Sequence, residues 1–434
     1  MKNNIAEFSV KDSKAFKIKM LNWCRRFNIF CFLDNGNYEQ NEPEFECLLA
    51  AGSKRSVTLQ RGNGLESLEH FSNAKDSWLF GHFGYGLLTN HDDRLQKNEV
   101  DFTDGFFFEP EILIRLKKNV IYIEYSTADD PVEIFHQVDG QYITMGEPGV
   151  LNIKFKKGLT EQEYISIIEH LKEHIHRGDC YEINFCQHFF AEDIFIDPFY
   201  YYHKLASISP NPFGAFYRLQ DKYCLCASPE RFLKKTGTRL ISQPIKGTSK
   251  RELSNKNIDD ANKQYLADSE KEKSENVMVV DLVRNDMSRV CTEGSVHVKE
   301  LFGIYSFPQV HQMISTIEGT VSAQTPWTDI IRACFPMGSM TGAPKIRVME
   351  LIERYERSAR GLFSGSIGYM TPGRDFDFNV VIRSLMYDET KNKISFNAGG
   401  GITYNSDAKQ EYEESMLKAA AIIKVLTNGA NSFS

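Results

Sequence analysis

The sequence predicts a mixed α and β fold, and three kinds of segment support this prediction. Residues 78–88, 106–116 and 119–125 are rich in aromatic and β-branched residues with Gly and Pro between them, a pattern typical of strands. Thr160 and Glu163 have the spacing of a helix capping box, and apolar residues at helical spacing follow them. The rest of the chain alternates between strand-like and helix-like segments.

The elements fall into two parts that meet near residue 150. The first part, 1–150, is predicted to be rich in strands, and the second, 151–434, to hold the catalytic residues. The boundary is placed in the polar stretch 129–157, which contains several Gly and Pro residues. After the helix that begins at Glu161, strands are predicted in 180–190, 211–220 and 222–233, and helices in 271–284 and 410–424.

Composition excludes several classes of protein. The 434 residues are 41% hydrophobic and carry a formal net charge of -7, which gives no reason to expect a nucleic-acid partner. The nine cysteines form no CxxC pair, so neither a disulfide framework nor a zinc site is predicted. No export signal and no run of about 18 uncharged apolar residues is visible, so we expect a cytoplasmic protein and no membrane association.

Two predicted helices each carry a pair of glutamates three residues apart. The pairs are Glu272 with Glu275, and Glu411 with Glu414, and each pair lies on one helix face. Facing carboxylate pairs repel unless a cation lies between them, and Mg²⁺ prefers such oxygen ligands. Spacing alone nevertheless favours two solvated helix faces.

Glu230 and Lys246 are candidate catalytic residues. Glu230 lies in SPERF, where a predicted strand ends, a frequent place for a catalytic carboxylate. Lys246 lies in an apolar turn between Pro244 and Gly247, where scarce water would lower its pKa and free the amine to attack. Considered alone, Lys246 is more simply a surface lysine in a β-turn.

Two glycine-rich stretches, 335–345 and 398–402, could bring backbone N–H groups to an anion. Neither matches a P-loop or a dinucleotide-binding fingerprint, so nucleotide binding is not predicted. His311, in PQVHQMIS, is either an acid–base group or a hydrogen-bonded core histidine, and an apolar strand favours the second.

Eight motifs in order resemble one enzyme family. The set resembles the chorismate-binding domain of the family that contains anthranilate, aminodeoxychorismate and isochorismate synthases, over about residues 159–426. The N-terminal part is similar more weakly, through WLFGHFGYGLL and FECLLAAG. The motifs are SPERF, PIKGT, KEKSENVMVVDLVRND, FPMGSMTGAPKIRVMELI, GLFSGSIGYM, VVIRS, AGGGIT and EYEESMLKA.

The resemblance implies a fold and a cofactor. It implies an α/β (α+β) fold of the anthranilate synthase type: two large, mostly antiparallel sheets packed face to face, helices outside, and an active site in the cleft between the halves. It also reverses the interpretation of the glutamates, since Glu272, Glu275, Glu411 and Glu414 then hold Mg²⁺, directly or through water.

The resemblance also assigns roles to single residues. Glu230 becomes the general acid for the departing C4 hydroxyl of chorismate, and Lys246 a nucleophile toward ring C2. The implied substrate-binding residues are Gly247, Thr248, His311, Ser339, Tyr369, Arg383, Gly400, Gly401 and Lys418.

Lys246 and Glu182 bear on which reaction the family site performs. Aminodeoxychorismate synthases have lysine in the PIKGT turn, where anthranilate synthases usually have alanine. Water-activating members have a lysine at the position of Glu182, where aminating members commonly have glutamine, so Glu182 is a departure. We therefore expect amination of chorismate at C4 to 4-amino-4-deoxychorismate, with anthranilate synthesis as the alternative and a non-catalytic relative as a remote one.

The ammonia is expected to come from another protein. No cysteine has glycines placed as in a nucleophile elbow, which a glutamine-hydrolysing domain would need. The resemblance implies a separate glutamine amidotransferase subunit as the partner.

Overall fold

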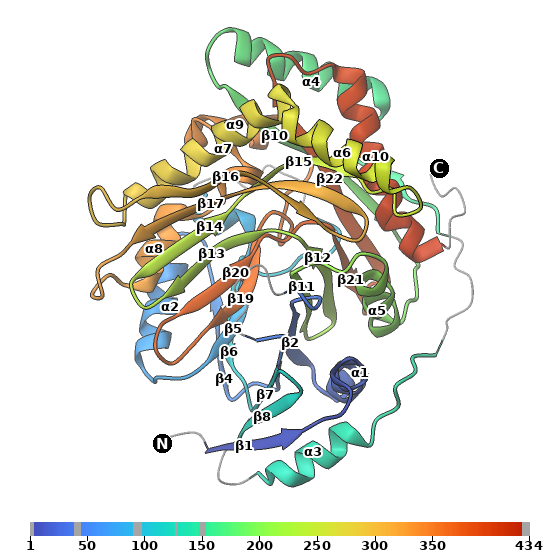
Figure 1. Cartoon of the computed structure of the whole chain (residues 1–434), viewed down its shortest axis with the longest axis vertical. Helices are drawn as coiled ribbons and strands as arrows, with labels where there is room; N and C mark the ends of the chain where they lie inside the picture. The colour runs from blue at the N-terminus through green and yellow to red at the C-terminus, as the bar shows by residue number, and fades with distance from the viewer. Residues whose placement is uncertain (1–3, 39–44, 90–97, 126–128, 147–152, 428–434) are drawn as a thin grey trace.

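Two large antiparallel sheets organise the chain in the computed structural model, which describes residues 4–38, 45–89, 98–125, 129–146 and 153–427 (Figure 1). The 12-stranded sheet runs, from edge to edge, through β1 (Asn4–Ser9), β8 (Val120–Tyr125), β7 (Ile112–Lys117), β3 (Cys47–Ala51), β2 (Ile29–Asp34), β11 (Phe213–Leu219), β12 (Lys222–Ser228), β21 (Ser384–Asp388), β22 (Lys393–Thr403), β10 (Glu182–Ala191) and β18 (Gly342–Ala343), with β9 (Lys156–Lys157) beside β10.

The 10-stranded sheet has β15 at one edge. Its order is β15 (Ile245–Lys250), β17 (Val310–Thr320), β14 (Arg239–Gln243), β13 (Arg231–Thr236), β20 (Phe376–Asn379), β19 (Ser366–Met370), β5 (Leu79–Phe83), β6 (Gly105–Glu109) and β4 (Arg55–Leu59), with β16 (His297–Ser306) beside β17. Strands from both halves of the sequence therefore pair within each sheet.

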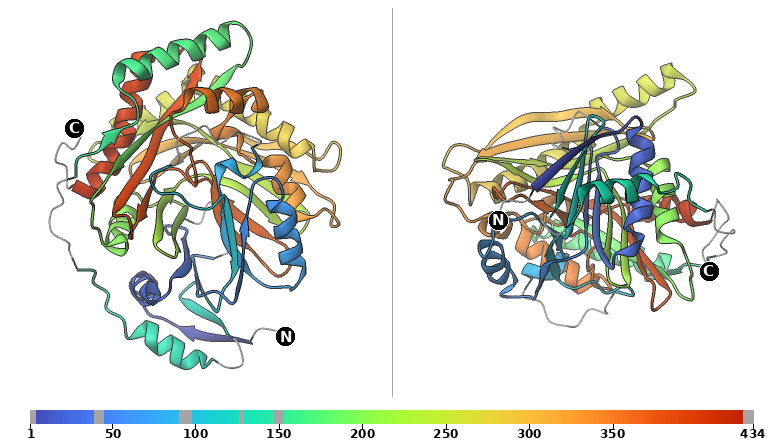
Figure 2. Two further views of the ribbon diagram at one scale, coloured as in Figure 1. Left: turned by 180° about the vertical axis from the view of Figure 1, so that it is seen from behind. Right: turned by 90° about the horizontal axis from the view of Figure 1, so that it is seen from below.

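Helices cover the outer faces of the sheets (Figures 1 and 2). The α-helices are α1 (Ser13–Trp23), α2 (Gly64–Asn73), α3 (Pro131–Asp139), α4 (Glu161–His176), α5 (Pro198–Ile208), α6 (Lys256–Asp268), α7 (Glu270–Ser288), α8 (Trp327–Cys334), α9 (Lys345–Tyr355) and α10 (Ala408–Thr427). Three short 3₁₀ turns complete the described elements: η1 (Cys24–Arg26), η2 (Tyr85–Leu88) and η3 (Gly338–Met340). The helix α7 packs on β15 and β17, and α10 packs on β22, so both reach the region of the candidate site.

The largest apolar core lies between the two sheets. Ala215 and Cys224 of the 12-stranded sheet share a cluster with Phe83, Phe107 and Phe378 of the 10-stranded sheet. A second cluster fills the space between the 12-stranded sheet and the helices α1, α3, α5 and α10. These clusters confirm the predicted arrangement of two face-to-face sheets with helices outside.

Most predicted elements form where they were expected. The capping box at Thr160 and Glu163 begins α4, and the two helices with paired glutamates are α7 and α10. The strand predicted over residues 78–88 ends earlier, at Phe83. The N–H of Tyr85 instead bonds the carbonyl of Gly361, and the 3₁₀ turn η2 follows.

The predicted boundary near residue 150 lies outside the described residues. On either side of it the strands interleave: β2 pairs with β11 and β5 pairs with β19. The two parts, 1–150 and 151–434, thus contribute strands to the same sheets. No helix of the described residues is long and apolar enough to span a membrane.

A buried ion pair joins the end of α9 to the 12-stranded sheet. Arg360 Nη2 lies 2.6 Å from Glu356 Oε1, and both residues are buried. Arg360 also donates to the carbonyls of Asn184 and Met340, and Glu356 accepts from the N–H of Cys186. The pair therefore links the residues after α9 to β10 and to η3.

Removal of one member of this pair should destabilise the fold. Glu356→Ala leaves the Arg360 guanidinium buried without its carboxylate, and we expect a loss of about 3 to 5 kcal/mol in the free energy of unfolding. Urea unfolding followed by circular dichroism measures this. Glu350→Ala on the exposed side of α9 is the control, and an equal loss there would contradict the assignment.

Candidate active site

The predicted lysine lies where the two sheets meet. Lys246 extends from the edge strand β15 and contacts the carboxylate of Glu182, the first residue of β10. Gly247 has a φ of 93°, a backbone conformation that favours glycine, and it forms part of an irregular register between β15 and β17. A Cβ added at Gly401 of β22 would collide with Lys246 Nζ. Lys246, Glu182 and Gly401 are thus in mutual contact.

Glu230 lies between β12 and β13 and is buried, with 4% of its surface exposed. Burial raises the pKa of Glu230 to about 7, although Ser339, Lys246 and Arg383 act in the opposite direction. At neutral pH a large share of this carboxyl is therefore protonated. A protonated carboxylic acid close to an amine can donate a proton to a leaving group.

Arg383 and Ser339 lie near Glu230. Burial lowers the pKa of Arg383 to about 10, while the Glu230 carboxylate opposes this effect. The backbone of Arg383 has a φ of 51°, in the left-handed region that a residue with a long side chain rarely adopts. Ser339 is buried in η3, and its carbonyl accepts a hydrogen bond from Asn184 Nδ2.

The paired glutamates of α7 and α10 lie beside glycines of the strands β15 and β22. A Cβ on Gly247 would lie 3.0 Å from Glu272 Oε2, and one on Gly400 would lie 3.2 Å from Glu411 Oε2. Lys418 Nζ is 2.7 Å from Glu414 Oε1 and donates to the carbonyl of Gly399. The structure therefore brings both pairs, the two glycines and Lys418 into one region.

The electrostatics of these carboxylates differ. Burial raises the pKa of Glu275 to about 7, and the neighbouring Glu182 and Glu272 carboxylates add to this rise. Burial raises the pKa of Glu272 and of Glu411, and Glu414 contributes in both cases. Burial acts the same way on Glu414, but nearby lysines, Lys418 foremost, together outweigh it and lower that pKa. Carboxylates that repel one another in this way suit an added cation.

The donor set of this region is compatible with a hard divalent ion. All four predicted ligands offer carboxylate oxygens: Glu411 is buried, Glu272 and Glu275 are partly buried, and Glu414 is half exposed. In the described part of the chain, no three His, Cys, Asp or Glu side chains already converge on a point at metal-ligand spacing. The glutamates of α7 and α10 would therefore have to move toward an ion to coordinate it directly.

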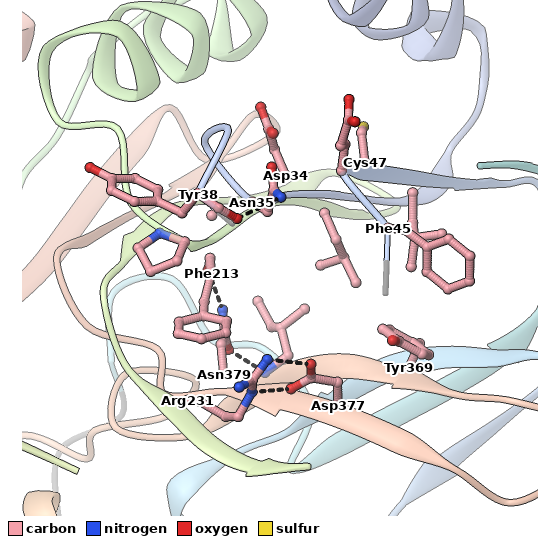
Figure 3. A pocket seen from close by; sticks show the side chains of 16 residues that line it. Asp34, Asn35, Tyr38, Phe45, Cys47, Phe213, Arg231, Tyr369, Asp377 and Asn379 are labelled. Carbon is pink, nitrogen blue, oxygen red and sulfur yellow. Dashed lines mark hydrogen bonds and ion pairs between the residues drawn. The ribbon is translucent and has the colours of Figure 1, made fainter. Parts of the chain in front are cut away.

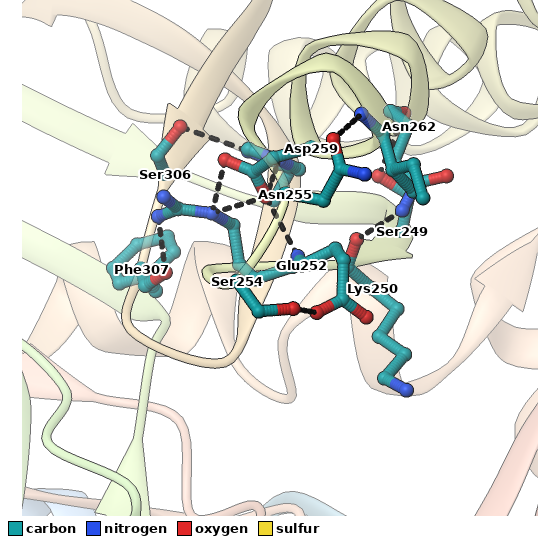
Figure 4. Close-up of polar contacts among 12 residues, drawn as sticks. Ser249, Lys250, Glu252, Ser254, Asn255, Asp259, Asn262, Ser306 and Phe307 are labelled. Atoms are coloured by element: carbon teal, nitrogen blue, oxygen red, sulfur yellow. Dashed lines mark hydrogen bonds and ion pairs between the residues drawn. The ribbon is translucent and has the colours of Figure 1, made fainter.

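His311 has its hydrogen-bond partners outside this group of residues. Its Nδ1 is 2.8 Å from Ser306 Oγ, and its Nε2 is 3.2 Å from Asp259 Oδ1 on α6. Figure 4 shows the polar network around Asp259, whose carboxylate also accepts hydrogen bonds from Arg251 Nε and from the N–H of Glu252. These contacts match the alternative interpretation of His311 as a hydrogen-bonded core histidine.

The neighbour of His311 is the residue that sequence reasoning missed. Gln312 pairs directly with Thr248 across β15 and β17, so the two side chains share a face of the sheet. Gln312 is 1% exposed, and its Oε1 has no hydrogen-bond partner. Strand alternation places His311 and Gln312 on opposite faces, but only the register shows which one accompanies Thr248.

The ring contacts of Tyr369 include two aromatic residues from the N-terminal part of the chain. Its ring lies 5.6 Å from that of Trp78 and 6.5 Å from that of Phe45, measured between centroids. Figure 3 shows Tyr369 in the lining of a pocket, near the ion pair of Arg231 and Asp377.

The charge state of Lys246 differs from the prediction. Burial alone lowers the pKa of Lys246, but the Glu182, Glu275 and Glu230 carboxylates together outweigh burial and raise the pKa above its ordinary value. The fall in the Lys246 pKa was predicted from the scarcity of water in the turn between Pro244 and Gly247, and these carboxylates were not considered. In the structure as described, Lys246 is an ammonium group paired with Glu182.

A comparison with protein families agrees with this site. The model of the family described as "chorismate binding enzyme" matches residues 30–424, which is most of the chain. The chain belongs to the chorismate-binding enzyme family. The matched segment contains every residue of the site described above.

Two relatives within the chorismate-binding enzyme family carry the same name. The chain is 36% identical over 328 residues to "Aminodeoxychorismate synthase component 1" of Salmonella typhimurium strain LT2, covering 76% of this chain and 71% of that protein. It is 37% identical over 289 residues to the protein of the same name from Escherichia coli strain K12, covering 67% and 63%. The second match spans less than two thirds of the E. coli protein.

A solved structure shows the same fold. The crystal structure of anthranilate synthase component I from Streptococcus pneumoniae TIGR4 superposes with a TM-score of 0.73 at 24% identity, covering 86% of this chain and 91% of that chain. At this identity the likeness establishes the fold alone. It agrees with the two-sheet architecture.

Proposed function

We propose that the protein is an aminodeoxychorismate synthase component 1: it aminates chorismate at C4 and so supplies 4-amino-4-deoxychorismate for para-aminobenzoate and folate biosynthesis. The observation that carries this proposal is the contact region in which Lys246 lies near a buried, partly protonated Glu230. The names of the relatives support the same reaction.

The proposed chemistry exchanges a hydroxyl for an amine in two substitutions. In the first, the Lys246 amine, once deprotonated, bonds to ring C2, the ring double bonds shift, and the C4–O bond breaks. Glu230 donates its proton to the departing hydroxide, which leaves as water. In the second, ammonia bonds to C4, the double bonds shift back, the C2–N bond breaks with its electron pair returning to the Lys246 amine, and the new ammonium group at C4 gives a proton back to the Glu230 carboxylate. Two such steps are each easier than one direct displacement.

The remaining site residues are proposed to bind the substrate. Gly247, Gly400 and Gly401 leave room beside the carboxylates and Lys246, because any side chain there would meet Glu272, Glu411 or Lys246. Lys418, Arg383, Ser339 and Thr248 offer donors to the carboxylates and hydroxyl of chorismate.

We infer that Mg²⁺ is the cofactor and that Glu272, Glu275, Glu411 and Glu414 hold it, directly or through water. When bound, it would neutralise the carboxylates and bind the ring carboxylate of chorismate. The raised pKa values of Glu272, Glu275 and Glu411 support this inference.

Activity should therefore depend on Mg²⁺ and on these glutamates. We expect chelation with EDTA to lower the rate by at least about 100-fold, because metal assistance is worth several kcal/mol, and Mg²⁺ to restore it. Glu411→Gln should weaken the response to Mg²⁺ in a titration of activity. Glu413→Gln, an exposed neighbour on the same helix, is the matched control. A rate unaffected by EDTA would contradict the metal assignment.

We also infer that ammonia comes from a separate glutamine amidotransferase. The "component 1" in the relatives' names implies a second component. The cysteines of this chain are unsuited to glutamine hydrolysis, because burial raises the pKa of every one, for example that of Cys186 to about 12.

That all nine cysteines are free thiols also supports a reducing, cytoplasmic location.

Product identification tests the proposed reaction. The purified chain is incubated with chorismate, Mg²⁺ and ammonium at mildly alkaline pH, and the products are separated and identified by mass. The proposal predicts 4-amino-4-deoxychorismate. Anthranilate together with pyruvate as the main products would contradict it.

A further inference from the structure

The contact between Glu182 and Lys246 connects the two sheets at the active site. Glu182 begins β10 of the 12-stranded sheet, and Lys246 projects from β15 at the edge of the 10-stranded sheet. Both side chains are largely shielded from water, with 4% and 11% of their surface exposed. The end of Lys246 is thus held by a residue from the opposite sheet.

Gly401 closes the other side of this contact. It lies on β22, which pairs with β10 so that Gly401 is opposite Asn184 and Thr403 is opposite Glu182. A Cβ at Gly401 would collide with Lys246 Nζ and would lie 2.7 Å from Glu182 Oε1. Glu182 and Gly401 therefore form a slot that just admits the Lys246 ammonium group.

We propose that Glu182 is a positioning residue for Lys246: it fixes the amine against Gly401, at the place from which it reaches the chorismate ring. This inference rests on the proposed function and adds the residue that orients its nucleophile. Other charged groups also act on Lys246, namely Glu275 on α7 and Glu230 before β13. Of these, Glu182 is the one that forms a hydrogen bond with Lys246 Nζ.

Positioning matters because lysine has a long and flexible side chain. Without a partner, the Lys246 side chain can adopt many rotamers, and few of them direct its amine at a bound ring. A misplacement of about 1 Å in a reacting group can cost about 100-fold in rate. A side chain that restricts Nζ to one place should therefore act on kcat more than on the binding of chorismate.

Kinetics of three variants test this. We expect Glu182→Ala to lower kcat for 4-amino-4-deoxychorismate formation by about 30- to 100-fold and to leave the KM for chorismate within about 3-fold. Glu182→Asp shortens the side chain by one methylene and so moves the carboxylate away from Lys246 Nζ. This variant should also lower kcat. Glu182→Gln keeps an oxygen that accepts from Nζ and should stay within about 5-fold of the wild type. Glu161→Ala, on the exposed face of α4, is the control.

A labelling experiment gives a readout that does not depend on turnover. The whole chain is treated with cyanate, and carbamylation of single lysines is followed by mass spectrometry. Without Glu182, Lys246 should react several-fold faster than in the wild type, relative to Lys418 as an internal reference. The labelling experiment still tests the contact between Glu182 and Lys246 if the wild type makes a different product. Failure of the proposed function is therefore distinguishable from failure of this inference.

Several results would overturn the inference. One is a folded Glu182→Ala variant with wild-type kcat. Another is a Glu182→Gln variant as slow as the alanine variant, since the acceptor oxygen would then not be what matters. Lys246 carbamylation at the wild-type rate in Glu182→Ala, or in Glu182→Asp if the alanine variant does not fold, would also overturn it.

Discussion

Lys246→Ala is expected to lower the rate of 4-amino-4-deoxychorismate formation by about 1,000-fold or more, because the variant loses the proposed nucleophile and must rely on direct displacement. The KM for chorismate should change far less, since the carboxylate-binding residues remain. Steady-state kinetics with ammonium as the nitrogen source measures both quantities. No other substitution proposed here should have a larger effect on the rate.

A second lysine of the same strand provides the matched control. Lys250 ends β15 and is exposed, so Lys250→Ala should leave kcat unchanged. If Lys246→Ala kept more than about a tenth of the wild-type rate, a covalent role for the lysine would be contradicted. A shift of the products toward anthranilate in this variant would instead mean that Lys246 selects the product and that the site can react without it.

Glu230→Gln should be the next most damaging change. The amide cannot donate the proton that the departing hydroxyl needs, and we expect a loss of about 100- to 1,000-fold in kcat. Burial raises the pKa of this carboxyl to about 7, so its protonated form is lost as the pH rises through that value. The kcat/KM of the wild type should therefore contain a limb that falls above about pH 7.

The pH profile distinguishes this role from a structural one. In Glu230→Gln the residual kcat/KM should lack the falling limb, because the titrating acid is gone. Glu293→Gln, at an exposed position between α7 and β16, is the control and should keep both rate and limb. A Glu230→Gln variant with a normal rate would show that another group protonates the leaving hydroxyl.

Local sequence signals predicted the elements well because they act within a few residues. The capping box at Thr160 and the glutamate pairs of α7 and α10 depend only on helical spacing, and the structure shows them as expected. The buried state of Glu230 follows from its place between two apolar strands. The two-sheet arrangement, in contrast, came from resemblance, because the alternation of strands and helices does not reveal which strands pair.

Several features of the site depend on contacts between residues that are distant in the sequence. The pKa of Lys246 was predicted to fall, but Glu182, 64 residues earlier, raises it from another sheet. His311 and Gln312 differ by one position, and only the register of β17 with β15 shows which of them accompanies Thr248. Tyr369 packs on Trp78, a partner from the N-terminal part of the chain.

The most direct test of the account is whether Lys246 becomes attached to the substrate. The enzyme is mixed with chorismate and Mg²⁺ without ammonia, quenched rapidly with acid, digested and analysed by mass spectrometry. The account predicts a peptide containing Lys246 that is heavier by chorismate less one water, and its disappearance when ammonium is added before the quench. Unmodified Lys246 under these conditions, in an enzyme that forms 4-amino-4-deoxychorismate once ammonium is present, would contradict it.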